Sequence, residues 1–336
     1  MAEALREEGY TTFAAGKWHL PLIEDCLRGV FRPLPARLDR SYRLLKPKPR
    51  ALCVGDTCGR PLRLWTLLGR RVALYVVFVV IGGDRMPELL DQQTFRAALE
   101  EAMKGTMARD ASFSRAWATG KLERKHFVQW ATNHYHYVGP FGDMLGIMYA
   151  KTPDTARDAK DFLLQNLYEE ELSDDRHTDL LIRFAEACGG TREQIMDRRN
   201  VMPFTLGIQG WQYKISMTEH FAVSTAATIV GLESQVPSIY RTQYPVLVDP
   251  GVYGFSEWEC EFFDLHITSD EVHGERGYQI VLKYADTPEL QERCIHAVRE
   301  AANMRFNYTK SLYETYVKPD LGEWVEPAAE PALATR

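Results

Sequence analysis

The sequence lacks the features that mark secreted, membrane-spanning and nucleic-acid-binding proteins. Its six cysteines form no C-x-x-C pair and no regular framework, which predicts reduced thiols. The amino terminus has no apolar signal core, and the longest apolar run, Val72 to Ile81, is far shorter than the roughly 20 residues of a membrane helix. A net charge of −6 gives no general basic footprint for nucleic acid or anionic membranes. We therefore expect a cytoplasmic protein whose partners are small molecules or proteins.

Charge and proline divide the chain into two unequal parts. Residues 1–85 contain 15 Lys+Arg and 8 Asp+Glu, whereas residues 86–336 contain 25 and 38. The first part also holds six of the 17 prolines and shows no sustained helical period. We expect residues 1–85 to be a basic, poorly ordered segment and not a domain.

The beginning of this segment, residues 1–20, resembles a fragment of the sulfatases, through Gly16-Lys17-Trp18-His19-Leu20. The C/S-x-P-x-R setting of a sulfatase nucleophile is absent from the chain, as is the calcium-binding set of acids. No sulfatase activity is therefore assigned to Lys17 or His19. We interpret the segment as a fused remnant or a misplaced start, with Met86 as the natural beginning.

From Met86 the sequence changes to long helical patterns that are separated by Pro and Gly turns. We predict an all-α domain over residues 86–320, followed by a disordered tail over 321–336. The predicted helices are 93–105, 111–119, 123–150, 153–174, 176–188, 191–198, 206–241, 255–270, 272–286 and 288–317.

The strongest chemical motif is His266-Ile-Thr-Ser-Asp270-Glu-Val-His273. Positions i, i+4 and i+7 fall within roughly 60° of one helix face, so the three side chains can converge on one point. Two histidines and one carboxylate are a donor set for non-haem Fe(II) with open positions, and the same set can hold zinc for hydrolysis. The alternative is a polar helix face on which both histidines hydrogen-bond to nearby acids.

A second cluster consists of Glu169-Glu170-Glu171 and, a few residues later, His177. A run of three glutamates is commonly a solvated surface, but Glu233 lies in an otherwise apolar helical pattern. A buried carboxylate needs a cation, a hydrogen-bond partner or a proton. The open alternatives for Glu233 are a metal ion or a pairing with Arg241 or Lys214.

Together these motifs supply three histidines and three carboxylates, which is the inventory of a dinuclear carboxylate site in a helical bundle. Three carboxylates against two Fe(II) ions leave a net charge near +1, which a protein core tolerates. The paired Glu-x-x-His signature of ferritin-like proteins is absent. Its single match, Glu123-x-x-His126, is expected to face solvent.

The pattern Glu170-x6-His177, Glu233, His266-x3-Asp270-x2-His273 resembles the haem-oxygenase-like diiron oxidases, a group that includes chlamydial para-aminobenzoate synthases. The stretch from Gln129 to Tyr137 also resembles the broader TenA and pyrroloquinoline quinone synthase superfamily. This resemblance spans about residues 90–318 and implies a haem-oxygenase-like helical bundle. It implies two Fe(II) ions, or one iron and one manganese, with O2 as co-substrate. The ligands that it implies are Glu170, His177, Glu233, His266, Asp270 and His273.

Glu170 is chosen among the three glutamates because it keeps the seven-residue step to His177, and Glu169 and Glu171 are expected to point elsewhere. The resemblance implies N-oxygenation or oxidative C–C cleavage of an amino-acid-like or fatty-acid-like metabolite. Some members make para-aminobenzoate from their own tyrosine and lysine. The candidate catalytic tyrosines are Tyr135, Tyr137 and Tyr240, for which core packing is the alternative. No lysine follows Glu233 closely, which argues against the self-sacrificing reaction.

The remaining histidines and cysteines carry weaker signals. His134, His136 and His220 either hydrogen-bond in the core or line a cavity, and His126 and His296 are expected at the surface. Cys260 is expected to be an inert core thiol and not a nucleophile.

Three other functions remain open from the sequence. The first is a metal-free oxidase resembling pyrroloquinoline quinone synthase, the second a helical protein-binding module, and the third a mononuclear zinc hydrolase. For the preferred diiron enzyme we expect a small-molecule substrate, an external electron donor as a further partner, and a homodimer as one candidate state.

Overall fold

A computed structural model describes residues 50–52, 62–69, 72–76, 88–172 and 175–325 of the chain. The chain divides into two compact units, Met1–Asp84 and Arg85–Arg336. In the first unit the described strands are β1 (Arg50–Leu52), β2 (Leu62–Gly69) and β3 (Val72–Val76), antiparallel in the order β1-β2-β3. The sulfatase-like stretch, the rest of the segment predicted to be poorly ordered, and the tail from residue 326 lie outside the described residues.

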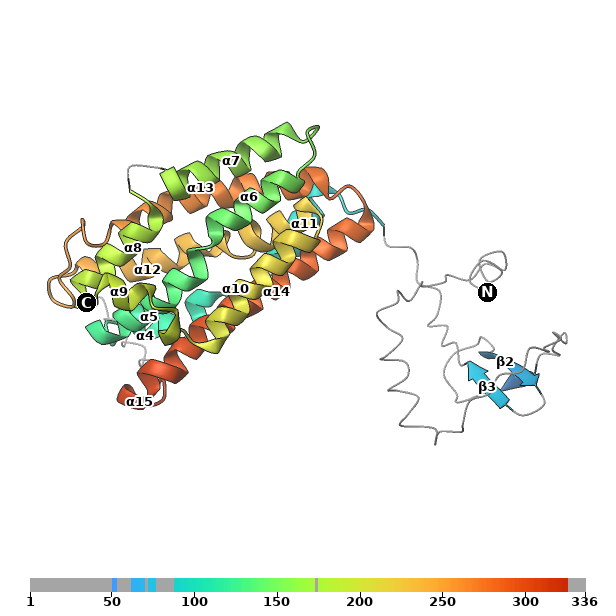
Figure 1. Cartoon of the computed structure of the whole chain (residues 1–336), viewed down its shortest axis with the longest axis horizontal. Helices are drawn as coiled ribbons and strands as arrows, with labels where there is room; N and C mark the ends of the chain where they lie inside the picture. Colours follow the sequence, from blue (N-terminus) through green and yellow to red (C-terminus); the bar gives the residue numbers. More distant parts are fainter. Residues whose placement is uncertain (1–49, 53–61, 70–71, 77–87, 173–174, 326–336) are drawn as a thin grey trace, which may run out of the picture. The chain divides into compact units, whose positions relative to one another are not determined.

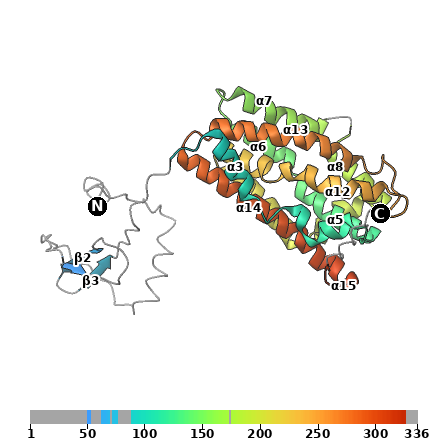
Figure 2. The same ribbon diagram turned by 180° about the vertical axis from the view of Figure 1, so that it is seen from behind.

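The second unit is a bundle of helices, drawn from opposite sides in Figures 1 and 2, and its described residues include no strand. The prediction of an all-α fold is therefore confirmed. In chain order the elements are α3 (Gln92–Ala102), η2 (Ala108–Asp110), α4 (Ser112–Ala118), α5 (Arg124–Val138), α6 (Phe141–Lys151), α7 (Arg157–Leu172), α8 (His177–Ala187), α9 (Arg192–Met196), η3 (Arg198–Asn200), α10 (Pro203–Thr218), α11 (Phe221–Thr225), η4 (Ala226–Val230), η5 (Glu233–Gln235), α12 (Val236–Val248), α13 (Glu261–Tyr284), α14 (Pro288–Leu312), η6 (Tyr313–Val317) and α15 (Lys318–Leu321).

Several predicted helix boundaries are wrong. The helix predicted over 123–150 is two helices, α5 and α6, which are separated at Gly139 and Pro140. The single helix predicted over 206–241 is divided into α10, α11, η4 and η5, and residues 236–241 begin α12. Conversely, the predicted break near residue 271 does not exist, because α13 continues from Glu261 to Tyr284. Its two glycines face closely packed neighbours: a Cβ on Gly274 would lie 3.1 Å from Ser234 Cβ, and one on Gly277 would lie 2.5 Å from Ile229 Cγ2. These glycines therefore allow close helix packing and do not mark a helix end.

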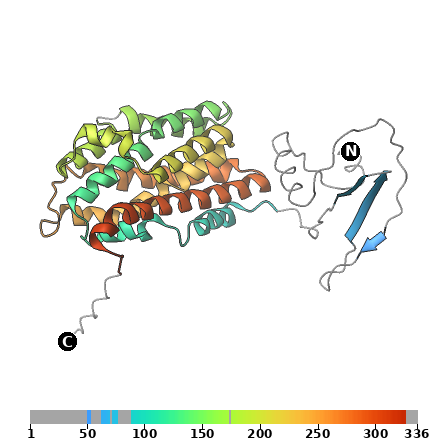
Figure 3. The same ribbon diagram turned by 60° about the horizontal axis from the view of Figure 1, so that its bottom comes forward.

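Helix α13 packs with one face against α12 and against the segment from α11 to η5, and its opposite face, which includes Thr268 and Val272, is exposed. Figures 1 and 2 both show α7 beside α13, and α14 runs along one side of the unit in Figure 3. An aromatic cluster fixes the start of α13: the Phe263 ring lies 5.4 Å from that of Trp117 and 4.8 Å from that of Phe184. These packed rings hold one end of the helix that carries His266, Asp270 and His273.

None of the helices in the described part of the chain is both long and apolar enough to span a membrane.

Candidate metal centre

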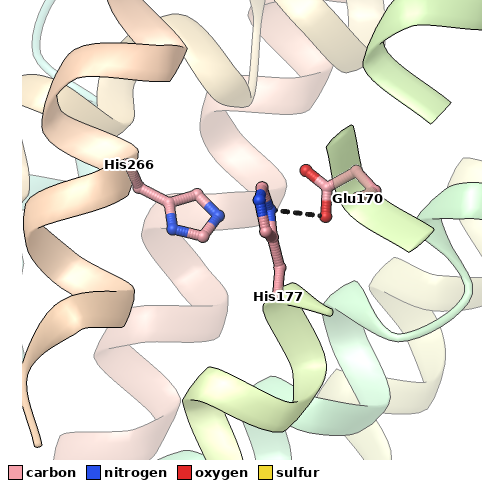
Figure 4. A group of neighbouring side chains, drawn as sticks. All are labelled: Glu170, His177 and His266. Carbon is pink, nitrogen blue, oxygen red and sulfur yellow. Dashed lines mark ion pairs between the residues drawn. The ribbon is translucent and has the colours of Figure 1, made fainter. Parts of the chain in front are cut away.

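The first of two candidate metal-binding groups joins three helices. Glu170 lies near the end of α7, His177 begins α8, and His266 lies one turn into α13. One ligand atom from each residue lies within 4.8 Å of the other two. As Figure 4 shows, the Glu170 carboxylate points toward the His177 ring, with 2.9 Å between Oε2 and Nδ1. The group is therefore a compact set of two imidazoles and one carboxylate.

The second group consists of Glu233, Asp270 and His273. Their ligand atoms also lie within 4.8 Å of one another, and all three side chains are buried. Asp270 and His273 come from α13, one and two turns beyond His266, whereas Glu233 begins the short helix η5. The structure thus divides the six residues of the sequence pattern into two neighbouring groups that share α13.

Backbone and carboxylate contacts fix the orientation of two imidazoles. Nδ1 of His266 donates to the carbonyl oxygen of Phe262 at 2.6 Å, which leaves Nε2 as a lone-pair donor. Nε2 of His273 lies 2.7 Å from Oε2 of Glu169, which leaves Nδ1 facing Asp270 Oδ1 at 3.6 Å. Such outer contacts are the usual way in which a protein orients histidine ligands toward a metal ion.

A break in the helix positions Glu233. The π-helical turn η4 ends at Val230 and the tight helix η5 begins at Glu233, so the regular hydrogen-bond ladder is interrupted between them. The freed carbonyls have side-chain partners: Gln235 Nε2 donates to Gly231 O at 2.5 Å, and the Arg305 guanidinium donates to Leu232 O. Glu233 follows a buried apolar run, and after the break its carboxylate lies beside Asp270 and His273 of α13.

The charges of the two groups depend on one another. Burial favours the neutral acid at Glu170, but the attraction of His177 holds the pKa of this carboxyl below its ordinary value. Burial disfavours a charged His273, but Asp270, Glu233 and Glu169 raise the pKa of its imidazole to about 10. Burial raises the pKa of Glu233 well above its ordinary value. Protons on His177 and His273 therefore supply positive charge to this acidic cluster, and a proton on Glu233 removes one of its negative charges.

Metal ions would supply the same positive charge, and the donor atoms suit iron. Carboxylate oxygens and imidazole nitrogens are its common ligands in helical bundles. The Nδ1 atom of His273 is buried and has no hydrogen-bond partner among the described residues, as expected of a ligand atom. The alternative that Glu233 pairs with Arg241 is wrong, because Arg241 pairs with Glu271. The other alternative partner, Lys214, is exposed. Asn166 Nδ2 makes only long contacts to Glu233, at 3.4 and 3.5 Å.

The three adjacent glutamates point in three directions. Glu170 faces His177, and Glu171 packs over Gly142 of α6, where an added Cβ would lie 2.6 Å from its Oε1. The expectation that Glu169 points away from the site is wrong, because its carboxylate accepts from His273. Successive helical positions differ by about 100°, so α7 can present one acid to α8 and the preceding one to α13.

An open groove of about 440 Å³ lies between α7 and α13, and its lining includes Gln165, Glu169, Ser269 and His273. The lining thus includes His273 of the second group and Glu169, whose carboxylate orients that histidine. The groove gives the buried cluster a route to solvent.

The candidate catalytic tyrosines lie in different surroundings. Tyr240 is buried, with its ring 6.3 Å from that of His266. Tyr137 is also buried and packs 5.0 Å from the ring of Tyr308, whereas Tyr135 is half-buried and contacts His136. The tyrosine hydroxyls of residues 240 and 308 approach the two ring nitrogens of His134, at 3.5 Å each. The sequence analysis missed Tyr308 and Arg305, because α14 has no motif around them.

The weaker predictions have mixed outcomes. His126 is fully buried, with Nε2 2.9 Å from Asp320 Oδ2, so its predicted surface position is wrong. His126 lies on the buried face of α5, and its partner Asp320 lies in α15. His296 is exposed, as predicted. Cys260 is a buried free thiol whose pKa is raised to about 12 by burial, in agreement with an inert core cysteine.

The sequence from residue 128 to 306, more than half of the chain, matches a family model described as iron-containing redox enzyme. The chain belongs to this family. Its two buried groups of histidine and carboxylate lie on helices within the matched region. Membership of an iron-containing family therefore indicates iron as the metal for which these two groups of side chains are suited.

Relatives and solved structures agree with a haem-oxygenase-like redox enzyme. The chain is 27% identical to a 4-aminobenzoate synthase of Nitrosomonas europaea over 66% of this chain and 92% of that protein. It is 21% identical to the bifunctional coenzyme PQQ synthesis protein C/D of Methylorubrum extorquens, over 71% of this chain and 63% of that protein. A Shewanella denitrificans domain with a haem-oxygenase-like fold superposes with a TM-score of 0.57 at 15% identity, covering 70% of this chain and 97% of that one. The predicted haem-oxygenase-like fold is confirmed.

Proposed function

We propose that this iron-containing redox enzyme is a non-haem diiron oxidase or oxygenase that uses O2 to oxidise a small amino-acid-like or fatty-acid-like metabolite. The observation that carries the proposal is the pair of buried groups, because three carboxylates and three imidazoles suffice for two iron ions. Glu170, His177 and His266 would hold one iron, and Glu233, Asp270 and His273 the other. When bound, the two irons supply the electrons and the binding site for reduction of dioxygen.

The protein's own residues give this centre a defined geometry and a dry surrounding. Phe262 O and the Glu169 carboxylate hold His266 and His273 in the tautomers that leave one nitrogen free. Packed side chains bury Glu233, Asp270 and both histidines of α13, which limits the access of water to the reacting groups. Tyr240, beside His266, has a neutral hydroxyl because burial raises its pKa, so it can donate a hydrogen bond or a proton.

We propose an external substrate and not a tyrosine and lysine of the chain itself. No lysine is buried among the described residues of 88–325, so the aromatic cluster contains no amine donor there. The similarity to a 4-aminobenzoate synthase supports an enzyme of this kind, but the proposed substrate class does not rest on that relative's name.

The decisive experiment is anaerobic loading of the full chain with Fe(II), followed by metal analysis and mixing with oxygenated buffer. We expect close to two irons per chain and rapid oxygen consumption with a transient visible absorbance. His177→Ala and Glu233→Ala should each lose about one iron and the absorbance change, while His296→Ala, at an exposed histidine, should behave as wild type. Absence of iron uptake by the wild type would overturn the proposal.

The similarity to a PQQ synthesis protein favours one second candidate, a metal-free oxidase that acts directly with O2. This candidate predicts undiminished oxidation after chelation and dialysis. Loss of activity on chelation, with recovery on addition of Fe(II) alone, would eliminate it.

A further inference from the structure

Arg305 is a buried cation with no counter-ion among the residues that the structure describes. It lies in α14 with 6% of its surface exposed, and no other lysine or arginine is buried among the described residues of 88–325. One amino group donates to the carbonyl oxygen of Leu232. No carboxylate in the described part of the chain lies within ion-pair distance of the guanidinium, although a guanidinium has five N–H donors.

Such an arrangement is unfavourable unless something compensates for the charge. Burying an unpaired charged group is among the costliest changes in a protein core, and a single neutral carbonyl compensates only part of that cost. Other arginines of this unit follow the usual rule: Arg293, on the same helix, pairs with Glu219, and Arg183 pairs with Asp175 and Glu261. Capping Leu232 alone does not require a positive charge, because an amide side chain can donate the same bond.

The aromatic neighbours of Arg305 do not supply a negative charge, and the carboxylates of the second metal group, Glu233 and Asp270, form no ion pair with it among the described residues. Burial raises the pKa of the Tyr137 hydroxyl, and the charge of Arg305 only partly opposes this, so the hydroxyl stays neutral at ordinary pH. The same two effects act on Tyr240 and on Tyr308. Burial, Arg305 and His266 together lower the pKa of His134, which leaves its imidazole neutral. Tyr308 lies one turn after Arg305 on α14, and its ring packs 5.0 Å from that of Tyr137, so two neutral hydroxyls on this side of the core can donate hydrogen bonds to an anion.

This cation also lies beside the two candidate metal groups. Leu232, whose carbonyl it contacts, directly precedes Glu233 of the second group. Tyr308, one turn after Arg305 on α14, and Tyr240, whose ring lies against His266 of the first group, both approach the ring nitrogens of His134. A molecule whose anionic end is held at Arg305 would therefore have its remainder close to the metal centre.

We infer that Arg305 is the anchor for a carboxylate group of the substrate, with the neutral hydroxyls of the surrounding tyrosines as additional donors. A carboxylate matches the planar guanidinium and brings a counter-charge to ion-pair distance, where the described residues place none. That the bound carboxylate belongs to a substrate rests on the proposed diiron function, whereas binding of a carboxylate at Arg305 does not depend on iron.

The test uses the full chain, both freed of metal by chelation and anaerobically loaded with Fe(II). Binding of 4-aminobenzoate and of octanoate is measured by calorimetry and by the shift in thermal midpoint, each against its neutral amide. The variant Arg305→Gln keeps an N–H for Leu232 and removes the charge, and Arg305→Lys keeps the charge without the planar fork. Arg293→Gln removes a paired arginine from the same helix and is the matched control.

We expect at least one of the two carboxylates to bind wild type about 10-fold or more tightly than its amide. Arg305→Gln should lose this preference, Arg305→Lys should retain part of it, and Arg293→Gln should retain all of it. The thermal midpoint of ligand-free Arg305→Gln should equal or exceed that of wild type, because an uncompensated charge has been removed.

Equal binding of acid and amide by wild type, or no binding of either acid, would overturn the inference. So would an Arg305→Gln variant that folds and keeps the full preference for the acid. If Arg305→Gln fails to fold, the acid–amide comparison in wild type and Arg305→Lys decides alone. Carboxylate binding by a protein that takes up no iron would contradict the diiron proposal and leave the role of Arg305 intact.

Discussion

Nε2 of His273 lies 2.7 Å from Oε2 of Glu169, so an imidazole N–H on α13 donates to a carboxylate on α7. This bond places a proton on the nitrogen that faces the groove and leaves Nδ1 of His273 for the buried side, where Asp270 and Glu233 lie. Glu169 is thus a positioning residue for a candidate ligand and not one of the six donors.

Glu169→Ala is expected to weaken iron binding at the second group by about 10- to 100-fold, because outer-shell carboxylates orient and polarise histidine ligands. The measurement is an anaerobic Fe(II) titration against a competing chelator. The first group, which uses Glu170, should keep its affinity. Glu171→Ala is the matched control, since Glu171 faces Gly142 on α6. Equal affinities of Glu169→Ala and wild type at both sites would show that the contact has no such role.

Gly277→Ala is expected to destabilise the helical unit by about 1–3 kcal/mol, because the new Cβ would overlap Ile229 in a packed core. Gly210→Ala is the control: Gly210 is an exposed position inside α10 with no atom near the added Cβ. That substitution should stabilise by about 0.5–1 kcal/mol. Thermal and urea unfolding of both variants provide the comparison. A neutral Gly277→Ala would mean that α13 can move away from η4 without loss.

Iron-loaded protein exposed to O2 without any added substrate should form no 4-aminobenzoate and should keep its intact mass. The reason is that no lysine is buried near the tyrosine cluster among the described residues. Liquid chromatography with mass detection measures the small molecule and the protein in one sample. Formation of 4-aminobenzoate, with loss of mass at a tyrosine of the chain, would show that the protein itself is consumed.

Cys260 and Cys294 should resist alkylation in the folded protein at pH 8. Burial raises the pKa of both thiols to about 12, so the reactive thiolate becomes populated only as the pH approaches that value. Iodoacetamide labelling followed by peptide mapping tests this for each cysteine separately. Unfolding in urea should return ordinary reactivity at both positions. Rapid labelling of folded protein at pH 8 would indicate that the local packing opens frequently.

The sequence by itself determined the helical character of residues 88–325 and the helix face that His266, Asp270 and His273 share. Both follow from local periodicity, because side chains at i, i+4 and i+7 share one face of any α-helix. The expected convergence of all three on one point is wrong, because His266 joins Glu170 and His177 while Asp270 and His273 join Glu233. The sequence also singled out the tyrosines on α5 and α12 as catalytic candidates, which stays a prediction, but it did not indicate their contacts.

Tertiary structure alone decided which groups meet across helices. The break between η4 and η5 lies where Gly231 packs closely against Ala301 and where Arg305 donates to Leu232 O, and neither contact leaves a local signal in the sequence. The inward position of His126 depends on Asp320, almost 200 residues later in the chain. Charged side chains such as those of Glu169 and Arg305 are usually solvated. Only the packing of distant helices brings Glu169 to His273, and only that packing buries Arg305 with no counter-ion among the described residues. Local spacing fixes the direction of a side chain on its helix, whereas the packing of distant helices fixes what that side chain meets.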